Sequence, residues 1–275
     1  MNGYDFRRVS VTALIPAFAR GEYTSIPWAK EMLAFLRSRG ATLSDGPWSE
    51  DAARAFAPVF EARFRAVTQA IVEKGATQVL ELAAGLSPRG MELARQGIVY
   101  VETDLPESVE RKREIITAIL GSVPENLHLC AASAVDRSQL IGCCSPFVTG
   151  RPVAVTTEGL LRYLTFEEKA LVARNVHEIL QRYGGWWMTP DVHLRGLTHR
   201  QTDDYRQKER ETLGRSLDEN YFEDLGHAQR FFEGLGFAVD SRPLFEGLQT
   251  EIQVPGSYQP VDLNDFRLFV MTPKL

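Results

Sequence analysis

Acidic side chains occur where short apolar segments end, and this placement is chemically informative. Glu81, Asp104 and Glu158 each lie at or just beyond a run of residues typical of a buried parallel strand. In a doubly wound sheet, ligands bind beyond the carboxyl ends of the strands, where the strand order reverses. Asp104 follows Gly85 by about 20 residues, a spacing at which a carboxylate accepts hydrogen bonds from an adenosine ribose. The alternative for Asp104 is an ordinary position at a helix start, before Pro106.

The segment around Gly85 predicts the turn against which such a ligand would lie. The apolar run 79–82 fits a central strand, and residues 83–85 (Ala-Ala-Gly) carry so little side chain that a ligand can approach the backbone. Ser87 is suited to a helix N-cap and Pro88 to the first helical position. A helix start beside a glycine turn attracts negatively charged or polar ligand groups, although any α/β fold also turns corners in this way.

The residues of this turn favour S-adenosylmethionine over a nicotinamide dinucleotide. A dinucleotide site requires the pattern Gly-x-Gly-x-x-Gly, in which the pyrophosphate contacts bare backbone. Ala83 and Pro88 occupy the first and third glycine positions, and proline also lacks the backbone N–H donor. The turn therefore suits a cofactor without a pyrophosphate, with a nicotinamide-dependent oxidoreductase as the alternative.

The elements that must position these residues alternate between strand and helix from Gly75 onward. Residues 9–74 are predicted to be mostly helical and to form a subdomain or lid. Strands and helices then alternate, which predicts a mostly parallel sheet with helices on both faces. Strands are expected at 77–82, 98–102, 127–131, 152–157 and 186–189, and helices at 88–95, 107–120, 165–183 and 221–235. The tail carries two strand segments, 237–244 and 266–272, which predict an antiparallel pair at one edge, the usual ending of the class I methyltransferase fold. We therefore expect a helical cap (1–74) and a Rossmann-like cofactor domain (75–275) with a helical lid at about 192–235.

Four segments between residues 62 and 164 are similar to known sequence motifs. Residues 82–89 are similar to Leu-Gly-Ala-Gly-Leu-Asp-Thr-Arg. Residues 102–106 (Glu-Thr-Asp-Leu-Pro) with Lys112 are similar to Glu-x-Asp-Leu-Pro with a downstream lysine. Residues 158–164 match Glu-Gly-x-x-x-Tyr-Leu, and residues 62–69 are similar to Ala-Arg-x-x-x-Val-x-Gln. Together they resemble the leucine carboxyl methyltransferase-like, polyketide-biosynthesis O-methyltransferase family, whose cofactor is S-adenosylmethionine.

This resemblance implies a role for each matching position. Arg63 would pair with the methionyl carboxylate of the cofactor, and Glu81 and Gly85 would form the wall and floor of the first loop. Asp104 would hold the ribose, and Glu158 would lie near the methionyl amino group or the transferring methyl. A pocket rich in carboxylates with one arginine complements a ligand that carries a carboxylate, an ammonium and a sulfonium.

The chain departs from the family pattern at several positions. Ala83 replaces a glycine and Ser87 an aspartate, and Ser133-Ala134 stands where Asp-Leu usually helps to hold the adenine. Asp136, a few residues on, is a possible substitute for that aspartate. These changes also keep open a non-catalytic binding module as an alternative. The expected cofactor-binding residues are Arg63, Glu81, Ala83, Gly85, Asp104, Leu105, Ser133, Ala134 and Glu158.

The methyl acceptor is less well defined than the cofactor. Methyl transfer from a sulfonium is an in-line displacement, so the protein mainly aligns the reactants; a carboxylate acceptor needs no general base, whereas a hydroxyl does. Tyr163 and His193 are the candidate catalytic residues, with Asp191 nearby and His199 less supported. Three N-terminal aromatic residues are expected either to cover the acceptor or to pack in the core: Phe18, Tyr23 and Trp28. We expect O-methylation of a small-molecule carboxylate, with protein carboxyl methylation as a weaker alternative.

The composition of the chain limits the binding partners and the cellular compartment that can be expected. The chain has 275 residues, 44% hydrophobic and 24% charged, with a net charge of -5 that predicts neither nucleic-acid nor anionic-membrane binding. Cys130, Cys143 and Cys144 lack zinc-site spacing and are expected to be reduced thiols, and no metal is predicted. Residues 1–10 do not resemble a signal peptide and no apolar run is long enough to span a membrane, so a soluble cytoplasmic protein is expected.

Overall fold

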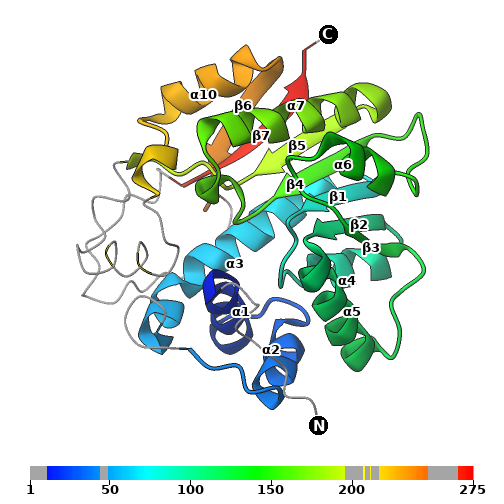
Figure 1. The fold of residues 1–275 in the computed structure, drawn as a ribbon, viewed down its shortest axis with the longest axis vertical. Helices are drawn as coiled ribbons and strands as arrows, with labels where there is room; N and C mark the ends of the chain where they lie inside the picture. Colours follow the sequence, from blue (N-terminus) through cyan, green and yellow to red (C-terminus); the bar gives the residue numbers. More distant parts are fainter. Residues whose placement is uncertain are drawn as a thin grey trace.

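The computed structural model describes residues 11–43, 49–195, 207, 211, 217–246 and 266–274. Its centre is a seven-stranded sheet of order β3-β2-β1-β4-β5-β7-β6 (Figure 1). Strands β1 to β5 run parallel, and β7 lies antiparallel between β5 and β6, which confirms the mostly parallel sheet with an antiparallel pair from the tail. The strands are β1 (Gln78–Leu82), β2 (Val99–Asp104), β3 (Leu127–Ala131), β4 (Val153–Thr157), β5 (Gly185–Thr189), β6 (Phe237–Pro243) and β7 (Arg267–Pro273).

Helices cover both faces of this sheet (Figure 1). On one face pack α1 (Val11–Tyr23), α2 (Ala29–Ser38), α3 (Glu50–Glu73), α4 (Arg89–Arg95) and α5 (Pro106–Leu120); on the other pack α6 (Arg137–Cys143), α7 (Phe166–Tyr183) and α10 (Leu225–Gly234). Successive strand residues point to opposite faces, so Val79 joins the first core and Leu80 the second. Both faces are buried, which explains why the central strands read as continuous apolar runs.

The sheet topology brings the sequence motifs to one edge. The chain runs from β1 to β2 and β3 on one side, and then returns to β4 on the other side of β1. Leu82 at the end of β1 is in register with Thr103 and with Thr157. Asp104 and Glu158 directly follow these partners, so both emerge beside the turn at Ala83. This is the switch point at which doubly wound sheets bind ligands.

Some local predictions need correction. Helix α4 begins at Arg89, with Pro88 rather than Ser87 as its N-cap, and Ser87 Oγ accepts a 3.4 Å hydrogen bond from Arg89 N. Helix α10 begins only at Leu225, since Phe222 is held in a bridge with Leu194 and Asp224 supplies the cap. Helix α6 was not predicted from the sequence. Residues 196–206 of the predicted lid, including His199, lie outside the described residues.

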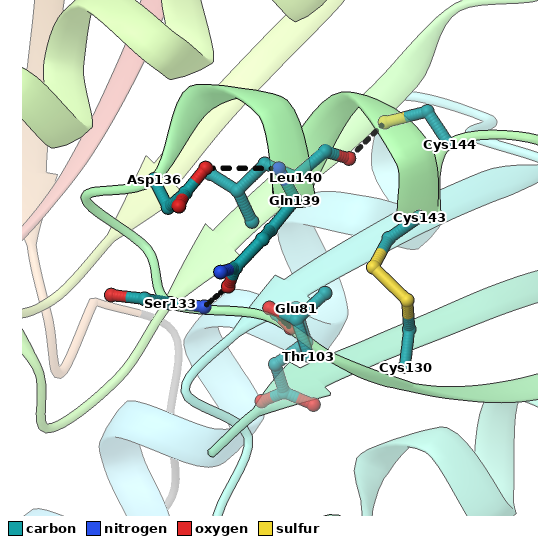
Figure 2. Close-up of a disulfide and its surroundings, with 9 residues drawn as sticks. All are labelled: Glu81, Thr103, Cys130, Ser133, Asp136, Gln139, Leu140, Cys143 and Cys144. Atoms are coloured by element: carbon teal, nitrogen blue, oxygen red, sulfur yellow. Dashed lines mark hydrogen bonds between the residues drawn. A yellow bond between two sulfur atoms is a disulfide. The ribbon is translucent and has the colours of Figure 1, made fainter. Parts of the chain in front are cut away.

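The expectation of three reduced thiols is wrong. The structure joins Cys130 at β3 to Cys143 at the end of α6 by a disulfide, with Cα atoms 5.9 Å apart (Figure 2). The unpredicted turn into α6 brings these two residues together, so their spacing in the sequence gave no signal. Cys144 is a buried free thiol whose pKa is raised to about 11 by burial.

Two further observations concern the described residues as a whole. No helix among them combines the length and the apolar character needed to cross a bilayer. Nor do they bring three or more His, Cys, Asp or Glu side chains together as ligands for a metal ion.

Candidate functional site

Asp104 organises the turn that follows β1. Its Oδ2 accepts a 2.7 Å hydrogen bond from Gly85 N, and its Oδ1 accepts one of 2.7 Å from Leu105 N. The neighbouring Ala84 N donates to Thr103 O at 3.0 Å, which joins the turn to β2. Asp104 is half-buried and Leu105 is 56% exposed, so this carboxylate lies at the surface of the binding edge. The two predicted residues Gly85 and Asp104 are thus in direct contact.

The backbone of this turn is left-handed at two positions. Ala83 has φ 52° and Gly85 has φ 51°. A residue with a Cβ is strained in this region by roughly 1–2 kcal/mol, whereas glycine is not. A Cβ built on Gly85 would have one neighbour within 4 Å, Ala83 O at 3.9 Å, so Gly85 borders open space. The turn therefore presents nearly bare backbone to a ligand, with strain stored at Ala83.

Substitution of Ala83 by glycine is expected to raise the free energy of unfolding by up to about 1 kcal/mol. The relief of left-handed strain exceeds the entropy that glycine adds to the unfolded chain. Urea denaturation measures the change. Ala84→Gly is the matched control: this alanine is 7% exposed and has no positive φ, so the same exchange should destabilise. Equal destabilisation by the two variants would show that Ala83 is not strained.

Glu158, at the end of β4, lies among three guanidinium groups. Its Oε1 accepts a hydrogen bond from Arg20 Nη2, and its Oε2 accepts one of 2.6 Å from Arg89 Nη2. Arg63 Nε lies 3.9 Å from Oε1. Burial alone would raise the pKa of Glu158, but the three arginines outweigh it and hold this pKa at about 2. Glu158 is therefore ionised throughout the physiological range.

Glu81 is fully buried and is committed to protein partners. Its carboxylate accepts hydrogen bonds from Arg89 Nη1 and, at 2.7 Å, from the Tyr100 hydroxyl. Arg89 itself is inaccessible to solvent and also donates from Nε to Thr68 Oγ1 at 3.2 Å. Glu81 thus orients Arg89, which in turn holds Glu158.

Arg63 and Asp191 form a second buried ion pair beside Glu158. Arg63 Nη2 donates to Asp191 Oδ1 at 2.6 Å. Asp191 Oδ2 accepts from the backbone N–H groups of Leu160 and Leu161, at 2.5 and 2.8 Å. Although burial opposes ionisation, Arg63 and the backbone N–H of Leu161 help to hold the pKa of Asp191 below its usual value. Asp191 thus fixes the turn that follows Glu158.

The two candidate catalytic residues lie on the two segments that the Asp191 carboxylate joins: Tyr163 closely follows Leu161, and His193 follows Asp191 itself. Tyr163 closes the short helix η3 (Leu161–Tyr163), and the guanidinium of Arg162 lies 5.3 Å from the centre of its ring. His193 is half-buried, and its Nδ1 lies 3.0 Å from the carbonyl oxygen of Asp191. Since a carbonyl only accepts, Nδ1 carries the proton and Nε2 the lone pair. Burial and the nearby Arg162 lower the pKa of His193 to about 3, so the imidazole is neutral at physiological pH.

The segment between β3 and α6 lies beside Asp104. Ala132 N donates to the Asp104 backbone oxygen at 2.9 Å, and Ser133 N donates to Gln139 Oε1 at 2.9 Å (Figure 2). Asn175 Nδ2 donates to Ala134 O at 3.0 Å. The Asp136 carboxylate caps α6 by accepting from Gln139 N at 3.0 Å. Ser133 and Ala134 are therefore held in place through their backbone, while Asp136 serves the helix.

The N-terminal helices contribute one residue to the site that the sequence did not reveal. Arg20 of α1 reaches Glu158, and the available signal was a single arginine in a mainly apolar helix. Of the N-terminal aromatic residues, Phe18 lies in the core. Trp28 donates from Nε1 to Glu92 Oε2 at 3.1 Å, which anchors the start of α2 to α4.

Comparison with solved structures shows the fold. The chain is similar to a DUF574 family protein from Streptomyces avermitilis MA-4680, with 17% identity, a TM-score of 0.63, and coverage of 96% of this chain and 97% of that chain. It is similar to a putative methyltransferase from Thermobifida fusca YX, with 15% identity, a TM-score of 0.59, and coverage of 99% and 97%. It is also similar to magnesium protoporphyrin IX methyltransferase from Synechocystis PCC 6803, which was crystallised with bound SAH, with 12% identity, a TM-score of 0.53, and coverage of 94% and 100%.

Comparison with protein-family models identifies the family of this chain. A search of the curated proteins found no match. The model of the family described as leucine carboxyl methyltransferase matches residues 28–177, more than half of the chain. The matched region contains β1, β2 and β4, whose carboxyl ends carry the turn, Asp104 and Glu158. It favours a methyltransferase over the nicotinamide-dependent alternative. The chain belongs to the leucine carboxyl methyltransferase family, whose methyl donor is S-adenosylmethionine.

Proposed function

We propose that this protein transfers the methyl group of S-adenosylmethionine to an oxygen atom of a small molecule, most readily a carboxylate. The observation that carries this proposal is the contact between Asp104 and Gly85 at the switch point of the sheet, 2.7 Å from carboxylate oxygen to backbone nitrogen. It joins the carboxylate that we expect to bind the ribose to a turn that borders open space at Gly85.

The charges of the site fit the two ends of a methionyl group. Arg20 and Arg63 are buried, and the Nε donor of each has no hydrogen-bond partner among the described residues. Glu158 lies between them as an ionised carboxylate. Gly159, which follows it, has open space where a Cβ would stand. A carboxylate and an ammonium therefore have complementary partners within this cluster.

We propose the following roles for predicted cofactor residues. Arg63 would hold the methionyl carboxylate and Glu158 the amino group. Asp104 would hold the ribose, with the exposed Leu105 beside it and the backbone of Ser133 and Ala134 toward the adenine. When bound, the cofactor supplies a methyl group that is already activated on a sulfonium, so the protein has mainly to align the acceptor with it.

The acceptor side of the site supports a carboxylate. A carboxylate is ionised at neutral pH and needs no general base, whereas a hydroxyl must lose a proton. His193 is a weak base because its pKa is lowered to about 3, mainly by burial. We propose that Tyr163 and His193 orient the acceptor. The Tyr163 hydroxyl can donate a hydrogen bond to a carboxylate, whereas His193 Nε2, which carries a lone pair, can accept one only from a donor elsewhere on the acceptor molecule.

The stability of the product to alkali tests this proposal. The protein is incubated with methyl-labelled S-adenosylmethionine and a low-molecular-weight cell extract, with the macromolecular fraction in parallel. A methyl ester releases labelled methanol in mild alkali, whereas a methyl ether or methylamine does not. We expect alkali-labile label in the small-molecule fraction. Alkali-stable label would contradict a carboxylate acceptor, and alkali-labile label confined to macromolecules would identify a protein carboxylate instead.

A further inference from the structure

Two motif residues, Lys112 and Glu102, have no role in the account above. Lys112 lies on α5 and is 2% exposed, and Glu102 lies on β2 and is also 2% exposed. A charged side chain is buried to this extent only where partners compensate the loss of water. Their surroundings therefore indicate what each of them does.

Lys112 contacts the turn between β1 and α4, residues 83–87, which we call the cofactor turn. Its ammonium donates to the carbonyl oxygen of Ser87 and, at 3.3 Å, to that of Gly85. It also lies 2.9 Å from Glu102 Oε2. Two of its three contacts are thus backbone oxygens of the segment between β1 and α4. A lysine ammonium has three donors and can satisfy all three groups at once.

We propose that Lys112 is a positioning residue for the cofactor turn, which it holds by two carbonyl groups, with Glu102 as its buried counter-ion. The functional part of this inference rests on the proposed function, since it takes residues 83–87 as one wall of the cofactor site. The turn is then held from two sides. Asp104 binds the N–H of Gly85, and Lys112 binds its carbonyl. Loss of Lys112 would let the Gly85 peptide rotate and would disturb Asp104.

Glu102 is present because Lys112 needs a counter-ion. It is in register with Glu81 on the neighbouring strand, and among the described residues its carboxylate accepts no hydrogen bond besides its contact with Lys112. A Cβ on Gly90 would lie 2.2 Å from Glu102 Oε1, so the glycine of α4 makes room for this carboxylate. Burial, together with Glu81 and Asp104, raises the pKa of Glu102 to about 7 against the opposing effect of Lys112. The ionised Glu102 carboxylate is thus unfavourable in this position, and its contribution to the turn is to balance the charge of Lys112.

Three variants separate positioning from charge balance: Lys112→Met, Glu102→Gln and the double variant. Methionine keeps most of the apolar stem but has no donor. Lys112→Met leaves Glu102 without its cation and should lower both the melting temperature and the cofactor affinity. The double variant removes both charges, so most of the melting temperature should return while the affinity for S-adenosylmethionine stays at least about tenfold weaker. Glu102→Gln alone keeps the lysine donors and should bind within about threefold of wild type.

Amide hydrogen exchange of the cofactor-free protein gives a second measurement. We expect faster exchange at residues 84–87 in Lys112→Met and in the double variant, and wild-type exchange in Glu102→Gln. A double variant with wild-type affinity, or with wild-type exchange at the turn, would overturn the inference, because Lys112 would then only neutralise Glu102. If wild type fails to bind S-adenosylmethionine while the exchange changes as expected, the proposed function fails and the positioning of the turn by Lys112 stands.

Discussion

Replacement of Glu158 by glutamine is expected to lower the free energy of unfolding by about 3–5 kcal/mol. Glutamine keeps the shape of the side chain but removes the charge that two buried guanidiniums contact and a third approaches. Arg20, Arg63 and Arg89 would then repel one another in a site with little water, with the carboxylate of Glu81 still beside Arg89. Urea denaturation of the two proteins at neutral pH measures the difference.

The control for this prediction is Glu178→Gln. Glu178 pairs with Arg137 at the surface, where the two side chains are 39% and 65% exposed, so its loss should lower the free energy of unfolding far less than the loss of Glu158. The dependence of the free energy of unfolding on pH provides a second test. Because the pKa of Glu158 is held at about 2, its ionised form stabilises the fold above about pH 4.5, and this contribution is lost as the pH falls toward 2. The difference between wild type and Glu158→Gln should narrow over that range. Equal effects of the two substitutions at neutral pH would contradict the described ion pairs.

Substitution of Gly185 by alanine is expected to destabilise the protein by about 3–5 kcal/mol, from left-handed strain and overpacking together. Gly185 begins β5 with φ 114°, opposite Val153 of β4. A Cβ at this position would lie 2.1 Å from Val153 O and 2.7 Å from Val153 N, which are backbone atoms in the sheet and cannot move aside. Strand β5 leads directly to Asp191, so displacement of the strand would also disturb the buried ion pair with Arg63.

The neighbouring glycine provides a matched control for this effect. Gly184 also has a positive φ, of 74°, but a Cβ there meets no atom within 4 Å. Gly184→Ala should therefore cost only backbone strain, roughly 1–3 kcal/mol, because φ 74° with ψ 175° lies in a region that is essentially restricted to glycine. Thermal or urea denaturation of both variants gives the comparison. Similar losses for the two would mean that β4 and β5 do not approach as closely as described.

Local sequence patterns predicted most of the helices and strands, because the residues within and next to each element largely determine its type. The capping box at Thr165 and Glu168 starts α7 as expected, and the antiparallel tail was evident from two strand segments without a helix between them. Helix α6 was missed because it is short and depends on its cap at Asp136 and on contacts with other elements. The disulfide between Cys130 and Cys143 was missed with it.

Some features of the candidate site could likewise be predicted from the sequence, whereas others could not. Asp104 and Gly85 could be paired from the sequence because each ends or follows a recognisable strand, and the sheet brings them into contact. The partners of the buried charges could not be predicted. Arg20 and Glu158 are 138 residues apart in the chain, and Arg63 and Asp191 are 128 residues apart. Side chains so distant meet only through the packing of α1 and α3 against the sheet, and a sequence pattern contains no record of that packing.

Calorimetric titration with S-adenosylmethionine tests the central claim most directly, with wild type and Asp104→Ala compared at the same pH and salt concentration. The account predicts that wild type binds at sub-millimolar cofactor and that Asp104→Ala binds at least tenfold more weakly, since the ribose loses a charge-assisted partner worth roughly 1.5–3 kcal/mol. Glu107→Ala, an exposed substitution in the first turn of α5, should bind as wild type does. The absence of binding by wild type would contradict the assigned cofactor site, and equal affinity of Asp104→Ala would remove Asp104 from it.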